Sequence, residues 1–169
     1  MNAKYYGKFR GTVVNNVDPE QRGRIMAIVP DVAGLIPGSW ALPCVAFAGK
    51  QSGMYVVPQV GAGVWIEFEQ GDPDYPIWTG GFWGSAAEVP VLAVVGNPAS
   101  PSVILASGLL SSISISDVPG PTGGIMIKAI SGAMILVNEI GITISNGQGA
   151  SIVMTGPTVT VNNGALVVT

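Results

Sequence analysis

The last 47 residues, Gly123 to Thr169, constrain the fold of this chain more than any other stretch. They include two charged side chains, Lys128 and Glu139, no aromatic residue and eight glycines. Gly, Asn, Ser or Pro separates short runs that are rich in β-branched and other apolar residues: IMIKAI, AMILV, ITIS, SIVMT, TVTV and ALVVT. Runs of four to six such residues between turn signals predict six consecutive β-strands joined by tight turns.

Apolar and polar residues alternate within several of these runs, as in Ile142-Thr143-Ile144-Ser145. Because successive side chains of a strand point to opposite faces, one face is predicted to be aliphatic and the other small and hydroxylated. Turn signals recur about every eight to nine residues. This short period favours a winding β-structure over hairpins packed under a helix.

The tail holds nineteen Ile, Val, Leu and Met residues, and no helix or aromatic cluster lies nearby in the sequence to cover them. Each is worth about 1.5–3 kcal/mol when fully buried. We therefore predict that other copies of the same tail provide the cover, as a homotrimeric, intertwined β-helix whose strand edges are closed. The alternative is an ordinary β-sandwich in which the tail is the second sheet. The residues predicted to line the shaft core and the trimer contacts are Ile125, Ile127, Ile135, Ile142, Ile144, Ile152, Met154, Val159, Val161, Leu166 and Val168.

Charge and composition narrow the functional classes. Charged residues make up 10% of the chain, against about 25% in a typical soluble protein, and this deficit favours an oligomer. The net charge of −3 gives no basic surface for nucleic acid. No stretch is long and apolar enough to predict a transmembrane helix, and the N-terminal MNAKYYGKFRG has no secretory signal pattern. Cys44 is the single cysteine, which fits synthesis in a reducing cytoplasm and predicts a buried small hydrophobe.

Aromatic residues divide the chain, because all twelve lie between Tyr5 and Trp83. We predict a globular domain over residues 1–84, a connector with one or two short strands over 85–112, and the shaft over 113–169. Within 1–84 the expected strands are KFRGTVVNN, GRIMAIVPD, residues 39–45, residues 64–69 and residues 77–83. Asp18-Pro19 is predicted to start a turn in which the carboxylate caps the following amides. Five strands without helical periodicity predict an all-β chain that begins with a small OB-fold barrel.

Several motifs of this domain resemble a known family. They are Asp18-Pro19 followed by Gly23-Arg24-Ile25, Trp40 with Pro43, Pro58 with Val60, Gly61, Gly63 and Val64, and Phe68 with Gly71, Asp72, Pro73, Pro76 and Gly80. The set resembles the N-terminal OB domain of the central spike of contractile tails, which includes phage baseplate assembly protein V, the VgrG proteins of type VI secretion and the spikes of pyocins and other injection systems. The glycine-punctuated tail is similar to the trimeric β-helix of these spikes.

The resemblance implies a homotrimer that caps the inner tube, contacts the baseplate hub proteins and points its β-helix at the target membrane. It assigns Gly61, Gly63, Gly71 and Pro73 to the turns of the barrel. The chain lacks the lysozyme-like insert and the histidines that hold iron in some relatives. Because Thr169 lies in a strand-like run, a separate tip-capping (PAAR-like) protein is expected. Synthesis in the cytoplasm and assembly into a phage-tail-like particle, a virion or an injection system, follow from the same resemblance.

The sequence gives little support for an enzymatic site. Without histidine there is no Ser-His-Asp or Cys-His arrangement. Glu67 and Glu69 are expected on one strand face, a spacing compatible with a glycosidase acid pair, although a solvated or subunit-contacting face explains them better. Asp72 and Asp74 are expected to be turn residues, with calcium binding as the alternative. We predict no catalytic residue, no cofactor and no metal site.

The tryptophans leave a second function open. Trp65, Trp78, Phe82 and Trp83 could form a stacking platform for sugars on the barrel. With few cations nearby, barrel core or subunit contact is the simpler explanation of these rings. The predicted function is a non-enzymatic structural spike, and the alternative is a carbohydrate-binding module on a β-helical spacer.

Overall fold

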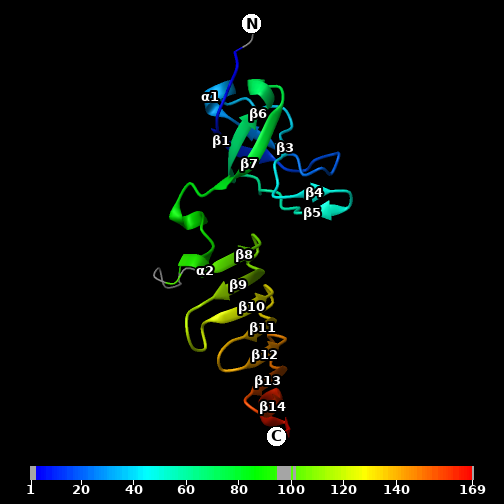
Figure 1. The fold of residues 1–169 in the computed structure, drawn as a ribbon, viewed down its shortest axis with the longest axis vertical. Helices are drawn as coiled ribbons and strands as arrows, with labels where there is room; N and C mark the ends of the chain where they lie inside the picture. Colours follow the sequence, from blue (N-terminus) through cyan, green and yellow to red (C-terminus); the bar gives the residue numbers. More distant parts are fainter. Residues whose placement is uncertain (1–2, 95–99, 101, 169) are drawn as a thin grey trace. The chain divides into compact units, whose positions relative to one another are not determined.

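The structure is a computed structural model that describes residues 3–94, 100 and 102–168, and strands dominate it (Figure 1). The chain divides into two compact units, Met1–Glu88 and Val89–Thr169. Helical elements in the described residues are short: α1 (Pro30–Ala33), α2 (Val91–Val94) and three single 3₁₀ turns, Glu69–Gly71, Ala86–Glu88 and Asn162–Gly164. The prediction of an all-β chain is confirmed.

The first unit is a five-stranded barrel. Its strands are β1 (Phe9–Asn15), β2 (Met26–Ile28), β3 (Leu42–Pro43), β6 (Gly63–Phe68) and β7 (Pro76–Phe82), in the spatial order β2-β1-β6-β7-β3. β3 and β7 are parallel and the other pairs are antiparallel. Ile25 and Ala41 exchange two backbone hydrogen bonds of 3.1 and 2.8 Å. Since these residues flank β2 and β3, the bridge joins the two ends of the sheet and closes the OB barrel.

Alternate side chains of the strands fill the barrel interior. In β6, Val64 and Ile66 point inward and are fully buried, while Trp65 and Glu67 face outward. The remaining buried hydrophobic residues of the core are Val13, Ile25, Ala27, Val29, Ala41 and Trp78. Val32 of α1 packs against the same cluster. A single apolar core therefore holds the first unit together.

The turn between β1 and β2 is organised by one carboxylate. Asp18 accepts hydrogen bonds from the backbone N–H groups of Glu20, Arg22 and Arg24 at 2.9, 2.8 and 3.2 Å. The predicted capping role of Asp18 is thus seen in the structure. Arg24 adds a contact that the sequence did not indicate, because its guanidinium donates to Asp18 Oδ1 at 2.6 Å and stacks over Trp40.

The glycines and proline assigned to the barrel turns have different surroundings. Gly61 lies in a turn at φ 90° and donates its N–H to the carbonyl of Val13. Gly63 is the first residue of β6, where an added Cβ would lie 2.7 Å from the Phe82 ring, so close approach of β7 favours glycine there. Gly71 is buried at φ 74°, and Pro73 follows in the Asp72–Tyr75 turn.

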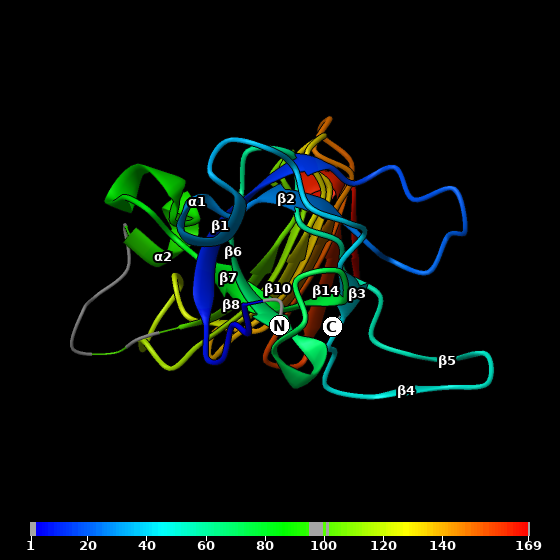
Figure 2. The ribbon, with the colours of Figure 1, turned by 90° about the horizontal axis from the view of Figure 1, so that it is seen from above.

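A short hairpin extends from the barrel. Residues 48–53 form β4 (Ala48–Gly49) and β5 (Ser52–Gly53), which pair antiparallel. Gln51 adopts a left-handed φ of 56° in the turn between them. Figure 2 shows this hairpin projecting away from the rest of the first unit, on the side away from α1.

The second unit is one antiparallel meander of eight strands. They are β8 (Val103–Ala106), β9 (Ser112–Ser116), β10 (Gly124–Lys128), β11 (Met134–Val137), β12 (Ile142–Ser145), β13 (Ser151–Thr155), β14 (Thr158–Val161) and β15 (Leu166–Val168). Each strand pairs with its neighbours in sequence, and the sheet runs from β8 to β15 in that order. All six strands expected after residue 123 are present. β8 and the first residue of β9 fall within residues 85–112, the segment expected to be a connector.

In the second unit, β9 to β14 pair on both edges within their own chain, and interwinding with other copies stays a prediction. Two other expectations differ from the structure. Cys44 was expected to be buried and is exposed, because it follows the two-residue strand β3. β6 ends at Phe68, so Glu69 begins a 3₁₀ turn and does not share a strand face with Glu67. The expectation drawn from Thr169 lies outside the described residues.

Candidate functional site

The register of the second sheet places most of its branched aliphatic side chains on one side, which we call the apolar face. Ile127 lies opposite Ile113 of β9 and Ile135 of β11, and Ile144 lies between Ile135 and Ile152. Directly opposed residues of an antiparallel sheet share a face. Following the same register through all strands, the described side chains of this face are Val103, Leu105, Ile113, Ile115, Ile125, Ile127, Ile135, Val137, Ile142, Ile144, Ile152, Met154, Val159, Val161 and Leu166.

Ten of the residues predicted to line the shaft are on this face. Six are exposed in the single chain: Ile125, Ile127, Ile135, Ile144, Ile152 and Leu166. Ile142, Met154, Val159 and Val161 are half-buried. The eleventh, Val168, has its backbone opposite Val159, and its side chain lies outside the described part of the structure.

Five residues of the apolar face were missed: Val103, Leu105, Ile113, Ile115 and Val137. All five are exposed, and Val103 is 64% accessible. The alternation Ser-Ile-Ser-Ile-Ser over residues 112–116 was the signal that could have found two of them. The sheet begins earlier than expected because β8 and β9 continue the same pattern upstream of residue 113.

The opposite face is mixed. It carries the hydroxyl groups of Ser114, Thr143, Ser145, Ser151 and Thr160, as predicted from the alternation. Strict alternation is absent from β8, β10, β11 and β13, so this face also carries Lys128 and the apolar residues Ile104, Met126, Met134, Leu136 and Val153. Among the described residues the apolar face has no ionisable side chain. Covering it therefore leaves no buried charge without a partner.

Asparagine side chains fix the turns that set this register. Asn146 Oδ1 accepts the N–H groups of Gln148 and Ala150 at 2.8 and 3.0 Å. Asn138 Oδ1 does the same for Ile140 and Gly141 at 3.0 and 3.2 Å. These two Asx turns flank β12 and hold its ends, so a one-residue slip of this strand, which would invert its faces, is opposed on both sides.

Two of the four acidic residues considered for chemistry, Glu67 and Asp72, form ion pairs. Glu67 pairs with Lys8 at 2.6 Å. Asp72 accepts the backbone N–H of Asp74 and pairs with Lys4, and these two contacts lower its pKa. In the part of the chain that the structure describes, no group of three or more His, Cys, Asp or Glu residues is arranged to hold a metal ion. These contacts leave Asp72 as a turn residue.

The aromatic residues do not assemble an open platform. Trp78 is 7% exposed and donates its indole N–H to the carbonyl of Gly23 at 3.1 Å, so it belongs to the core. The guanidinium of Arg10 lies over both Trp65 and Phe82, at 5.4 and 4.9 Å from the ring centroids. These cation–π contacts cover one face of each ring, which is then not open to a sugar. Trp83 is exposed.

No helix in the described residues combines the length and the apolar character needed to cross a bilayer.

Comparison with known families covers most of the chain. A family model described as the type VI secretion system/phage-baseplate injector OB domain matches residues 9–83. A second, described as the phage baseplate V C-terminal trimerisation domain, matches residues 102–167. A search of curated proteins finds no match to the chain.

The barrel, the meander sheet and the two matches define a spike-type structural protein of phage or type VI secretion baseplates. The chain belongs to the phage baseplate V family. The first match coincides with the barrel strands β1 to β7, and the second begins one residue before β8. The family is one of structural baseplate proteins.

Proposed function

We propose that three copies of this chain form a non-enzymatic spike that caps the inner tube of a contractile baseplate and pierces the target envelope. The apolar face of the second sheet is the observation that carries this proposal. Eleven of its aliphatic side chains are exposed in the single chain, across strands β8 to β15. A continuous apolar surface of this size marks an interaction site.

The copies are proposed to meet through faces and not through strand edges. Because β9 to β14 are paired on both sides within one chain, their backbone groups have no hydrogen-bonding capacity left for other copies. Three sheets arranged around a common axis would turn their apolar faces inward and their hydroxyl-bearing faces outward. The match of residues 102–167 to a trimerisation domain supports three copies.

The dimensions of the sheet suit a narrow shaft. Strands of four or five residues span about 15 Å, and eight strands stack over about 34 Å. The second unit has only three charged residues, Asp117, Lys128 and Glu139. Since charged groups are costly to bring into a bilayer, this low charge favours passage of the shaft through a membrane.

The proposed partners are the inner tube and the baseplate hub at the barrel, and a tip-capping protein at the other end of the shaft. The match of residues 9–83 to an injector OB domain supports the placement of the barrel within a baseplate. Cytoplasmic synthesis followed by incorporation into a phage-tail-like particle belongs to the same proposal. Cryo-electron microscopy of assembled particles would test these contacts, and a shaft apex closed by its own chains would exclude the tip protein.

The solution mass of the purified full-length chain is the first test. Light scattering should give three times the chain mass of 17.3 kDa, and the trimer should persist in mild denaturant because the apolar faces would be buried. A soluble monomer would mean that the apolar face needs no cover. A stable dimer would contradict the three-sided shaft.

A further inference from the structure

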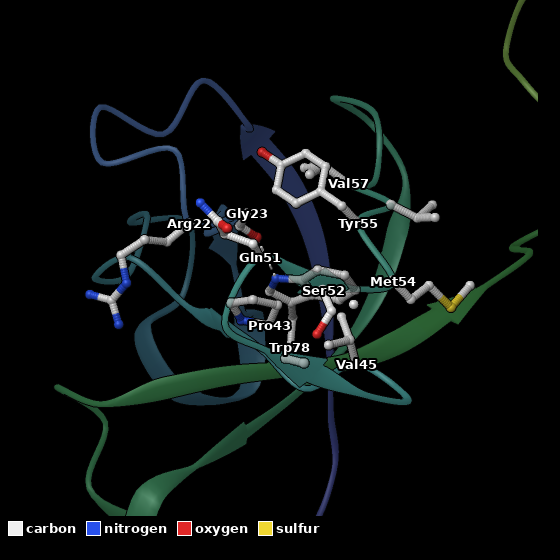
Figure 3. Close-up of a pocket in the computed structure, with 13 residues that line it drawn as sticks. Arg22, Gly23, Pro43, Val45, Gln51, Ser52, Met54, Tyr55, Val57 and Trp78 are labelled. Carbon is white, nitrogen blue, oxygen red and sulfur yellow. Dashed lines mark hydrogen bonds between the residues drawn. The ribbon is translucent and has the colours of Figure 1, made fainter.

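The first unit has an apolar pocket at the base of the β4–β5 hairpin (Figure 3). Its volume is about 350 Å³, and its walls include Pro43, Val45, Met54, Tyr55, Val57 and Trp78. Trp78 is held in place by its hydrogen bond to Gly23. The pocket is thus formed in advance, and a side chain that enters it would not have to order its floor.

The rim of the pocket is apolar and positively charged. Tyr55 lines the pocket and is 69% exposed, and Phe47 is exposed on the same hairpin. Arg22 lines the pocket but is already paired with Glu20 at 3.0 Å. Lys50, which forms no ion pair among the described residues, lies in the hairpin turn beside the lining residue Gln51. No acidic residue is among the described lining residues. These properties fit an occupant that is apolar and carries a nearby negative charge.

The loop that follows α1 has the complementary properties. Leu35 and Ile36 are 82% and 71% exposed, the most accessible pair of adjacent aliphatic residues among those described in this unit. Asp31 lies in α1 and forms no ion pair with the described residues. Gly38 donates its N–H to the carbonyl of Ala27 at 3.1 Å, so the loop is anchored to β2 and presents its side chains outward.

We propose that Leu35 and Ile36 of one copy insert into the Trp78 pocket of the next copy in the trimer. A ring with three-fold symmetry uses two different surfaces of each subunit, one against each neighbour. The loop and the pocket are two such surfaces, since α1 and the β4–β5 hairpin lie on different sides of the first unit (Figure 2). Asp31 of the entering loop pairs with Lys50 at the rim. This inference depends on the proposed trimer and adds a contact between the barrels.

Cysteine cross-linking of the full-length chain tests the contact. In a Cys44→Ser background, Leu35→Cys and Met54→Cys should form disulfides between copies, because insertion brings loop and rim to bonding distance. Mild oxidation should then give bands of two and three linked chains on a non-reducing gel. The matched control replaces Tyr75, which is exposed on a different turn, with cysteine in place of Leu35. Equal linking by the control pair would overturn the proposal.

Charge reversal provides a second measurement. Asp31→Lys and Lys50→Glu should each reduce the cross-linking yield several-fold, and the double variant should restore it because the pair is re-formed with opposite sign. Light scattering is run on the same samples. A trimer that fails to cross-link overturns the docking of Leu35 while the proposed spike stands, and a monomer overturns both.

Discussion

Arg24 donates a hydrogen bond to Asp18 Oδ1 at 2.6 Å, and the carboxylate that receives it also holds three backbone amides of the same turn. The Asp18 side chain is 3% exposed and that of Arg24 is 13% exposed. Arg24, together with these amides, holds the pKa of Asp18 well below its usual value, against the opposing effect of burial. The β1–β2 turn therefore depends on one ionised carboxylate.

Asp18→Asn should lower the thermal midpoint of the first unit by several degrees, because the largely buried Arg24 loses its ion pair with Asp18 and keeps only the one with Glu20, which is itself exposed. Since folding lowers the pKa of Asp18, its contribution is present at neutral pH and is lost as the pH falls below the ordinary value of 3.8. The midpoints of the wild type and the variant should converge in that acidic range. Fluorescence follows this unit alone, since all four tryptophans lie before residue 84.

Asp74→Asn is the control for this prediction, because Asp74 is exposed and forms no ion pair among the described residues. At every pH its thermal midpoint should equal that of the wild type within experimental error. A midpoint difference for Asp18→Asn that stays constant from neutral to strongly acidic pH would contradict the role of the ionised carboxylate.

Trp78→Phe tests the floor of the pocket. The change removes the indole N–H and leaves the carbonyl of Gly23 without its partner, which costs about 1–3 kcal/mol when the group is buried. Trp83→Phe is the matched control, because Trp83 is exposed and its loss should change stability by less than about 0.5 kcal/mol. Denaturant unfolding monitored by the remaining tryptophans measures both. Equal effects would show that the Gly23 contact is not stabilising.

Gly71→Ala should destabilise the barrel more than Gly61→Ala. Both residues have positive φ, 74° and 90°, so alanine in either place costs about 1–2 kcal/mol of backbone strain. At Gly71 the added Cβ would also lie 3.1 Å from the backbone nitrogen of Tyr5, whereas at Gly61 it would meet nothing within 4 Å. Urea midpoints compare the two. A larger loss at Gly61 would mean that contact with the N-terminal segment does not matter.

Local patterns predicted most of the strands. The alternation of Ile with Thr and Ser over residues 142–145 predicted β12 and its two faces correctly. Successive side chains of a strand point to opposite faces, so a two-residue period in the sequence gives the faces directly. The Asp18-Pro19 turn was likewise predictable, since the carboxylate reaches amides only two to six residues away. Barrel closure through Ile25 and Ala41 could be expected only as part of a fold class.

Contacts between distant residues were not predictable from spacing. Arg10 over Phe82 joins β1 to β7, and nothing in either segment indicates the other. The Trp78 pocket arises because the hairpin at residues 48–53 lies over β7, a long-range arrangement that no local pattern encodes. The pairing of β9 to β14 within a single chain was also not predicted, and the reason is different. Composition indicates that the apolar side chains need cover, but it does not say whether strand edges or sheet faces meet the neighbour.

Ile144→Asp tests the apolar face itself. Ile144 lies between Ile135 and Ile152 at the middle of the sheet, so in the proposed trimer its side chain enters the shared core. An aspartate there would be an unpaired charge in an apolar environment, at a cost of several kcal/mol for each copy. We expect the solution mass to fall from that of a trimer to that of a single chain, with tryptophan fluorescence of the first unit unchanged.

Thr143→Asp is the matched control, because Thr143 is the preceding residue of β12 and faces the other side of the sheet. Its aspartate would meet solvent in the proposed assembly, so the trimer mass should be retained. Both variants add the same charge to the same strand, and a general loss of sheet stability would affect them equally. A trimer that survives Ile144→Asp and dissociates on Thr143→Asp would show that the hydroxyl-bearing face, and not the apolar face, is turned toward the axis.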